Sequence, residues 1–221
     1  EALAAASRRA FAAGIPVIVY KLGRSDVGRE LAVSHSGAIS GPDEAATAYF
    51  RHHGILRVDM LETLLELPAL VEGRHPPAGR RVAVVTTTGG GAAMVADNLG
   101  RRGVELVPAP DKVVSDLAPL GIDIKNAQLI DLTMAGARKE VYGAVLQSLL
   151  DDPSCDAVVA VVGSSAQFHP EIAVEPILAV GRHEKPLAAF LVPQADHSLA
   201  LLAEAGTAAF RTPESCADGL A

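Results

Sequence analysis

A histidine set among small hydroxyl residues is the first feature of this chain whose chemistry packing does not explain. Ser34, His35, Ser36, Gly37 and Ala38 follow one another, and these neighbours leave the imidazole ring uncrowded. Imidazole can do nucleophilic chemistry, because one ring nitrogen attacks as a neutral group near pH 7 while a carboxylate can hold the other. Taken alone, the segment fits either a surface histidine or a nucleophile.

A glycine-rich turn between a predicted strand and a predicted helix is the second such feature. Glycines let backbone N–H groups approach a ligand, and a helix start contributes about half a positive charge, which suits a phosphate. The turn is neither a Walker A loop nor a full GxGxxG, since Met94 takes the third glycine position. It fits either a phosphate site or a tight strand-to-helix connection. Its residues are Thr86, Thr87, Thr88, Gly89, Gly90, Gly91 and Ala92.

Isolated histidines and a serine turn lie near predicted strand ends, where ligands of parallel sheets bind. His169 and His197 are each alone there, and Gly163-Ser164-Ser165 follows a buried strand. The turn lacks the G-x-S-x-G pattern of hydrolases, so Ser-His-Asp catalysis has no support in the sequence.

Charged residues beside these features have two interpretations each. Lys21 and Arg24 precede the histidine segment, where they either neutralise a phosphate or are simply solvated. Asp97 and Asp131 either orient an imidazole or satisfy backbone N–H groups at turns. The sequence leaves both questions open.

The first part of the chain predicts an incomplete parallel α/β domain. A long connection over 21–42 holds His35, and connections of this length are uncommon unless functional or disordered. Two strands and three helices are too few for an independent doubly wound domain, so we expect the back half of one. The chain starts inside a helical pattern without an initiator Met, as a piece of something longer would. The expected elements are helix 1–13, strand 16–20, helix 42–53, strand 55–58 and helix 60–72.

Residues 73–80, rich in proline and glycine, predict a linker to a second domain, which divides the chain into domains 1–75 and 76–221. Alternating strands and helices imply right-handed crossovers and a parallel sheet. The predicted fold class is α/β, with flavodoxin-like parallel sheets, helices on both faces, one partial and one complete domain. The expected strands are 81–86, 104–107, 157–162, 186–192, 208–210 and a short one around Leu129, and the helices are 92–102, 110–117, 135–150, 171–182, 195–205 and one from Pro213.

Composition and charge exclude several classes of function. The 221 residues are 49% hydrophobic with a net charge of −7, and they lack the basic clusters that nucleic acids require. The longest apolar run, 157–162, is far shorter than the roughly 20 residues that span a bilayer. Cys155 and Cys216 form no CxxC pair and no metal spacing, so we expect reduced, packed thiols and no metal site. No secretory leader pattern is present, and we expect a cytoplasmic protein.

The histidine segment resembles a known family. Lys21-x-Gly23-Arg24-Ser25, then Ser34-His35-Ser36-Gly37-Ala38 and Gly41-x-Asp43, are similar to the phosphohistidine segment of NDP-forming acyl-CoA synthetases, relatives of succinyl-CoA synthetase. The family has Thr where Ser36 stands, which keeps the hydroxyl. Residues 76–221 resemble the family's carboxy-terminal flavodoxin-like domain, with 129–133, LIDLT, similar to its Asn-Pro-Val-Asp-Leu-Thr. The Asn-Pro part departs, because Asn126 lies further upstream and no proline follows it.

The resemblance implies an acid-thiol ligase that forms acyl-CoA, a nucleotide diphosphate and phosphate from a small carboxylic acid, CoA and ATP or GTP. In the family the histidine, here His35, accepts a phosphoryl group from an acyl phosphate and passes it to the nucleotide diphosphate. The phosphate-binding residues that the resemblance implies are Ser34, Ser36 and Gly37 beside the histidine, and Thr88, Gly89, Gly90 and Gly91 at the helix start that receives it.

CoA, ATP or ADP, and the Mg²⁺ that accompanies the nucleotide would bind CoA-binding and ATP-grasp domains or subunits, whose patterns this chain lacks. We expect the chain alone to bind none of them and to work within an oligomer. In the family the carboxylate that holds the imidazole is a Glu upstream of helix 1–13. The alternative is a regulatory or scaffold module, such as the synthetase-like part of a protein acetyltransferase without ligase turnover. The acid, and the choice of ADP or GDP, stay open.

Overall fold

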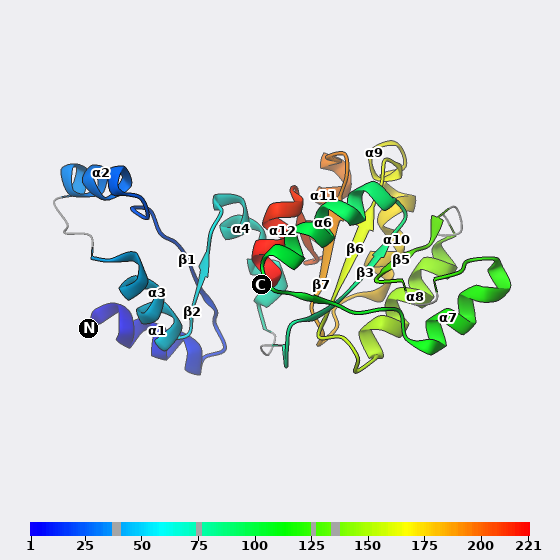
Figure 1. Cartoon of the computed structure of the whole chain (residues 1–221), viewed down its shortest axis with the longest axis horizontal. Coiled ribbons are helices and arrows are strands. Elements are labelled where there is room, and N and C mark those ends of the chain that lie inside the picture. The colour runs from blue at the N-terminus through cyan, green and yellow to red at the C-terminus, as the bar shows by residue number, and fades with distance from the viewer. Residues whose placement is uncertain (37–40, 74–76, 125–126, 134–137) are drawn as a thin grey trace.

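Two parallel sheets of unequal size organise the chain. The computed structural model describes residues 1–36, 41–73, 77–124, 127–133 and 138–221, with His35 and Ser36 described by their backbone alone. The smaller sheet lies in the first part of the chain and the six-stranded sheet in the rest, one after the other along the longest axis (Figure 1). No helix within the described ranges is long and apolar enough to cross a membrane.

The smaller sheet pairs β1 (Val17–Tyr20) with β2 (Ile55–Val58) in parallel, with Val17 opposite Ile55. Val and Ile favour this extended state because their branched side chains pack well on a pleated surface. The helices α1 (Ala2–Ala12) and α3 (Asp43–His52) accompany these strands. These four elements, called here the N-terminal unit together with α2, match their predicted ranges to within one residue at each end.

Within residues 21–36, which the structure describes, the connection between β1 and α3 is largely helical, and here the sequence-based expectation is wrong. It contains a helix, α2 (Asp26–Ser36), with Asp26 in its first turn. The hydroxyl of Ser25 accepts the N–H of Gly28 at 3.1 Å, as an N-cap residue does. The start signal was therefore present in Ser25-Asp26, and the glycine and serines that suggested a loop are tolerated within the helix.

The predicted helix 60–72 is two helices, α4 (Leu61–Glu66) and α5 (Pro68–Val71). Proline has no N–H to donate to the preceding turn and begins helices well, so the chain breaks at Pro68. The helix α4 contacts strands of both sheets, and α5 contacts β8 of the second. Val58 of β2 lies in one buried cluster with Leu67, Leu70, Phe210 and Cys216. The N-terminal unit therefore leans on the C-terminal part, as expected for an incomplete sheet, while the boundary at residue 75 stays a prediction.

The larger sheet has the strand order β4-β3-β6-β7-β8, all parallel. When the short strand β5 is set aside and the other strands are numbered along the chain, that is the 2-1-3-4-5 order of flavodoxin-like folds, and the predicted fold class is confirmed. A further short strand, β5, pairs with the carboxyl half of β3 on the side of β4. The strands are β3 (Arg81–Thr86), β4 (Glu105–Leu106), β5 (Leu129–Asp131), β6 (Ala157–Val162), β7 (Leu187–Leu191) and β8 (Ala208–Phe210).

Helices cover both faces of this sheet, as predicted. Alternate residues of the central strands point to opposite faces, so Val158 and Ala160 of β6 join one buried cluster while Val159 and Val161 join the other. The first face carries α7 (Asp111–Leu117), α8 (Lys139–Asp151), α10 (Pro170–Val180) and α11 (Asp196–Glu204), and the second carries α6 (Gly89–Arg101) and α12 (Pro213–Leu220).

Several details of the larger domain differ from prediction. The helix predicted over 135–150 is α8 (Lys139–Asp151), and residues 135–137 of that prediction lie outside the described residues. The glycine-rich turn is the first turn of α6, which begins at Gly89 instead of after the glycines. The four-residue helix α9 (Ser165–Phe168) and the 3₁₀ turn Ala118–Leu120 were not predicted, since neither shows a periodic pattern of its own. Cys155 and Cys216 are buried and free, in agreement with packed thiols.

Candidate functional site

His35 falls in the last turn of α2, but its side chain and that of Ser36 lie outside what the structure describes, as does Gly37. Ser34 is exposed, and its hydroxyl donates to the carbonyl of Leu31 at 2.9 Å. The backbone of His35 therefore lies in a regular α-helix. The assignment of His35, Ser36 and Gly37 stays a prediction.

The basic residues that precede the histidine segment are already engaged by carboxylates. Arg57 of β2 donates two hydrogen bonds to Asp43, at 2.7 and 3.0 Å. Lys21 lies 3.7 Å and Arg24 3.8 Å from the same carboxylate. The hydrogen bond from Arg57 is the main reason that the pKa of Asp43 is held below its ordinary value.

This arrangement favours a structural role for the cations. Arg24 also pairs with Asp59, so two carboxylates offset three basic side chains at the carboxyl ends of β1 and β2. The group ties the start of α3 to β2 and leaves at most one uncompensated positive charge. Binding of phosphate by Lys21 or Arg24 would require a change of partners.

The start of α6 offers backbone N–H groups to a ligand. Thr88 is its N-cap residue, in extended conformation, and its side chain makes no capping hydrogen bond. The hydroxyl of Thr86 holds the backbone that leads into α6, because it accepts the N–H of Thr88 and donates to the carbonyl of Thr88, both at 2.8 Å. The first N–H groups of a helix have no partner within it, so those of the exposed Gly89 and Gly90 remain available.

A carboxylate lies beside this helix start. A Cβ atom placed on Gly89 would come within 3.3 Å of Asp131 Oδ2. The other oxygen, Oδ1, accepts the N–H of Thr133 at 2.9 Å, so Asp131 does satisfy turn backbone. Asp97 lies exposed further along α6, about two turns away, and takes no part here. Asp131 therefore complements the positive helix start and is within reach of a group that binds there.

A cavity of about 410 Å³ lies at the carboxyl ends of β3 and β6. The chain leaves β3 toward β4 on one side and reaches β6 on the other, so this is the switch point of the sheet, where ligands of such folds bind. The N–H of Gly163 donates to the hydroxyl of Thr87 at 3.3 Å and joins the two strand ends. Polar residues in the wall of the cavity include Thr87, Thr88, Thr133, Ser164, Ser165 and His169.

Sequence reasoning found part of this pocket and missed the rest. Thr88, the Gly163-Ser164-Ser165 turn and His169 were singled out separately, and the structure brings all of them into one wall. His197 is exposed beside Glu171 and is not among its lining residues. Thr133 was missed as a site residue, because only the pairing of β5 with β3 places its turn beside the start of α6.

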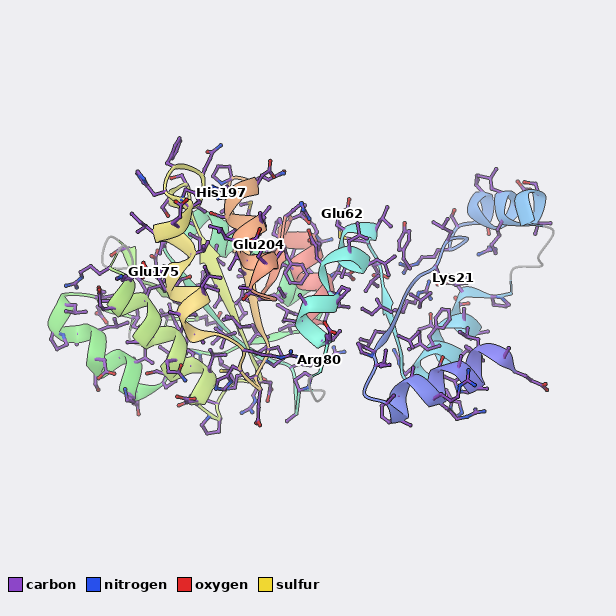
Figure 2. All side chains as sticks on the ribbon, turned by 180° about the vertical axis from the view of Figure 1, so that it is seen from behind. Lys21, Glu62, Arg80, Glu175, His197 and Glu204 are labelled. Atoms are coloured by element: carbon purple, nitrogen blue, oxygen red, sulfur yellow. The ribbon has the colours of Figure 1, made fainter. Side chains whose placement is uncertain are left out.

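The two chemical features do not meet in this structure. The helix α2 lies at the far end of the N-terminal unit, well away from α6 (Figure 1). Lys21, where the connection to α2 begins, and His197, on α11, are likewise widely separated (Figure 2). Among the described residues, no group of three or more His, Cys, Asp or Glu side chains could hold a metal ion.

Comparison with known proteins matches the two parts to one group of enzymes. Residues 1–71 match the model of the succinyl-CoA ligase like flavodoxin domain. The chain is 29% identical over 212 residues to the alpha subunit of an ADP-forming acetate–CoA ligase II of Pyrococcus furiosus, covering 91% of this chain and 46% of the relative. It is 28% identical over 198 residues to a trans-feruloyl-CoA synthase of an unknown prokaryotic organism, covering 85% and 27%.

A solved structure of a similar enzyme also resembles this chain. An acetyl-coenzyme A synthetase 1 of Ca. Korarchaeum cryptofilum, in complex with phosphate and ADP, superposes with a TM-score of 0.75 at 25% identity, over 93% of this chain and 46% of that one. These comparisons confirm the resemblance to NDP-forming acyl-CoA synthetases. The chain spans about half the length, or less, of the curated relatives it matches.

Proposed function

We propose that this chain is part of an ADP-forming acyl-CoA synthetase and that His35 carries phosphoryl groups between its active sites. The complete enzyme would convert a carboxylate, CoA and ATP to acyl-CoA, ADP and phosphate. The observation that carries the proposal is the match of residues 1–71, which include the histidine segment, to the succinyl-CoA ligase like domain. The flavodoxin-like sheet that follows supplies an uncapped helix start at its ligand-binding edge.

The start of α6 is the proposed receiving site for phosphorylated His35. Its exposed Gly89 and Gly90 leave room for phosphoryl oxygens to approach backbone N–H groups, and the helix dipole favours their negative charge. Asp131, beside Gly89, is placed to accept the N–H of the imidazole nitrogen that does not carry phosphorus. A carboxylate in that role makes the other nitrogen a better nucleophile.

The proposal requires that the segment between β1 and α3 change its place. Because α2 lies apart from α6, His35 reaches the receiving site either when this segment swings across or when a second copy of the chain supplies α6 (Figure 1). Among the described residues, the five residues 21–25 before α2 are the point at which such a movement would turn.

The remaining parts of the reaction belong to regions outside this chain. CoA-binding and ATP-grasp domains or subunits are the proposed partners, and the nucleotide with its Mg²⁺ would bind there. Full turnover is not expected of the 221 residues alone, and we expect an assembly of several subunits in the cytoplasm.

Phosphorylation in the assembled enzyme tests the proposal. The chain, combined with its ATP-grasp and CoA-binding parts, is incubated with ATP labelled in the γ-phosphate, and we expect an acid-labile, alkali-stable label on the chain. His35→Asn should abolish the label, whereas His197→Asn, which changes an exposed histidine of the other domain, should keep it. Label that persists in the His35→Asn variant would refute the carrier role. An unlabelled wild-type assembly would support the regulatory or scaffold module instead.

A further inference from the structure

The helix that carries His35 forms one piece with the residues just before it. The hydroxyl of Ser25 accepts the N–H of Gly28 at 3.1 Å. The guanidinium of Arg29 donates to the backbone carbonyl of Arg24, also at 3.1 Å. Because these hydrogen bonds tie the first turns of α2 to the chain that leads into them, a movement of α2 carries Arg24 with it.

The pivot of such a movement lies between β1 and Arg24. Residues 21–23 connect the two without regular secondary structure. Gly23 has a φ of 81°, in the left-handed region that glycine adopts at little cost. Packing holds α2 weakly, since Val27 is 66% and Leu31 56% exposed. The resting position of the helix therefore depends on the polar contacts of the piece to which it belongs.

Arg24 joins this piece to the body of the N-terminal unit. Its Nη1 donates to Asp59 Oδ1 at 2.5 Å, and its Nε lies 3.8 Å from Asp43 Oδ2. Both partners are fixed from the other side. The backbone N–H of Asp59 is held by Asp218 at 2.9 Å, and the carboxylate of Asp43 is held by Arg57 of β2. The ion pairs of Arg24 thus hold α2 where the structure places it, apart from α6 (Figure 1).

These pairs, called here the Arg24 latch, can open at little cost. The side chain of Arg24 is 50% and that of Asp59 42% exposed, so water solvates both charges when they separate. Asp43 keeps Arg57 and Lys21 as partners after Arg24 has left. An exposed ion pair shifts an equilibrium by no more than about fivefold in typical cases. Such a latch favours one position of the helix without locking it there.

We propose that Arg24 is a positioning residue for phosphoryl transfer: its ion pairs hold α2 away from α6, and they must open before His35 reaches the receiving site. This assignment rests on the proposed function, and it adds the residue that controls the movement. A direct contact of Arg24 with the phosphoryl group is the alternative role, and it predicts different kinetics.

Distances between two spin labels on the 221-residue chain test the latch. Glu30→Cys places one label on α2 and Glu62→Cys the other on α4, both at exposed positions, while the native Cys155 and Cys216 are buried. Because α4 contacts both sheets, the pair reports movement of α2 against the body, whichever copy of the chain supplies α6. We expect one main distance with a minor displaced share. Arg24→Gln should raise the ratio of displaced to main distances by about two- to fivefold.

Two further variants separate the latch from a general loss of charge. Lys21→Gln is the matched control, because Lys21 lies 3.7 Å from Asp43 on the β1 side of the pivot. It removes a positive charge from the same carboxylate and should leave the distances unchanged. Arg24→Asp should increase the displaced share, and adding Asp59→Arg should shift the distances back toward the wild type. An unchanged distribution in Arg24→Gln, or an equal change in Lys21→Gln, would overturn the proposal.

Phosphoryl transfer in the assembled enzyme gives the second test, with acetyl phosphate labelled in its phosphoryl group as the donor. An imidazole nitrogen of His35 forms the N–P bond, and the P–O bond to acetate breaks, so acetate leaves as the carboxylate. In the proposed function this transfer takes place with His35 at the start of α6. Arg24→Gln should therefore label His35 about two- to fivefold faster at saturating donor, with the KM for acetyl phosphate unchanged.

The opposite kinetic result would decide for the alternative role. Slower labelling of His35 in Arg24→Gln, with a raised KM for acetyl phosphate, would overturn the latch and assign Arg24 to the phosphoryl group. An unlabelled wild-type enzyme would contradict the proposed function while the distance result still stood, so the two failures can be told apart.

Discussion

Replacing Gly91 by alanine should destabilise the protein through crowding at the start of α6. A Cβ atom at this position would lie 2.5 Å from Val192 Cγ1 and 3.0 Å from both Thr88 Cγ2 and Val161 Cγ1. Carbon atoms normally approach to about 3.5–4.0 Å, so at least one of these neighbours must move. Val161 belongs to the buried central strand β6, and a valine has only one side-chain torsion with which to yield.

The expected magnitude follows from these contacts. Overpacking of a well-filled core costs typically about 1–3 kcal/mol, and alanine returns at most about 1 kcal/mol of helix propensity. For a chain of this size, each kcal/mol lowers the melting temperature by roughly 2–4 °C. We therefore expect Gly91→Ala to melt several degrees below the wild type.

Gly90→Ala is the matched control, because a Cβ atom at Gly90 meets nothing within 4 Å. It should leave stability unchanged or raise it by about 0.4–1 kcal/mol, since alanine restricts the unfolded chain. Urea unfolding of both variants measures the difference, which we expect to be at least about 1.5 kcal/mol. If the two alanine variants were equally stable, close packing of position 91 against Val192 and Val161 would not be the reason that glycine is required there.

Two further predictions concern buried carboxylates. Asp218 accepts the N–H groups of Asp59 at 2.9 Å and of Met60 at 3.2 Å. Asp218→Ala should therefore lower the free energy of unfolding by about 1–3 kcal/mol and loosen the start of α4. Urea unfolding measures the first effect, and faster amide exchange at Asp59 and Met60 measures the second. The hydrogen bond from Arg81 holds the pKa of Asp156 below 3.8, so its stabilising contribution, complete above that value, is lost as the pH falls through the lower folded-state pKa. Asp156→Asn should flatten this decline in the urea midpoint below about pH 4, and an unchanged pH profile would contradict the role given to the pair.

Much of the fold could be predicted because short-range patterns in the sequence specify it. β3 and β6 are runs of valine and alanine with helical segments between them, and such alternation permits little besides a parallel sheet covered on both faces. The α2 helix was missed although Ser25 and Asp26 mark its start, because the glycines and serines around His35 outweighed that signal. Pro68 divided one predicted helix into two.

The candidate site was predictable only in pieces. The histidine segment stood out from its residue types, and the glycine-rich helix start from its position between a strand and a helix. Nothing in the local sequence shows that Asp43 and Asp59 engage Lys21 and Arg24, since these pairs join residues at least 19 positions apart. The side chain of His35 lies outside the described residues, and its role stays a prediction.

The sequence by itself determined the kind and order of most elements and singled out the histidine segment, because hydrophobic period and capping residues act over a few neighbours. Tertiary structure alone decided that Thr88, Thr133, Ser164 and Tyr142 share one cavity and that α2 lies apart from α6. Side-chain period reports which face of a strand is buried but not which strand lies beside it. That choice depends on the packing of all the strands and helices together, and it is what brings the ends of β3 and β6 together around the unpaired hydroxyl of Tyr142.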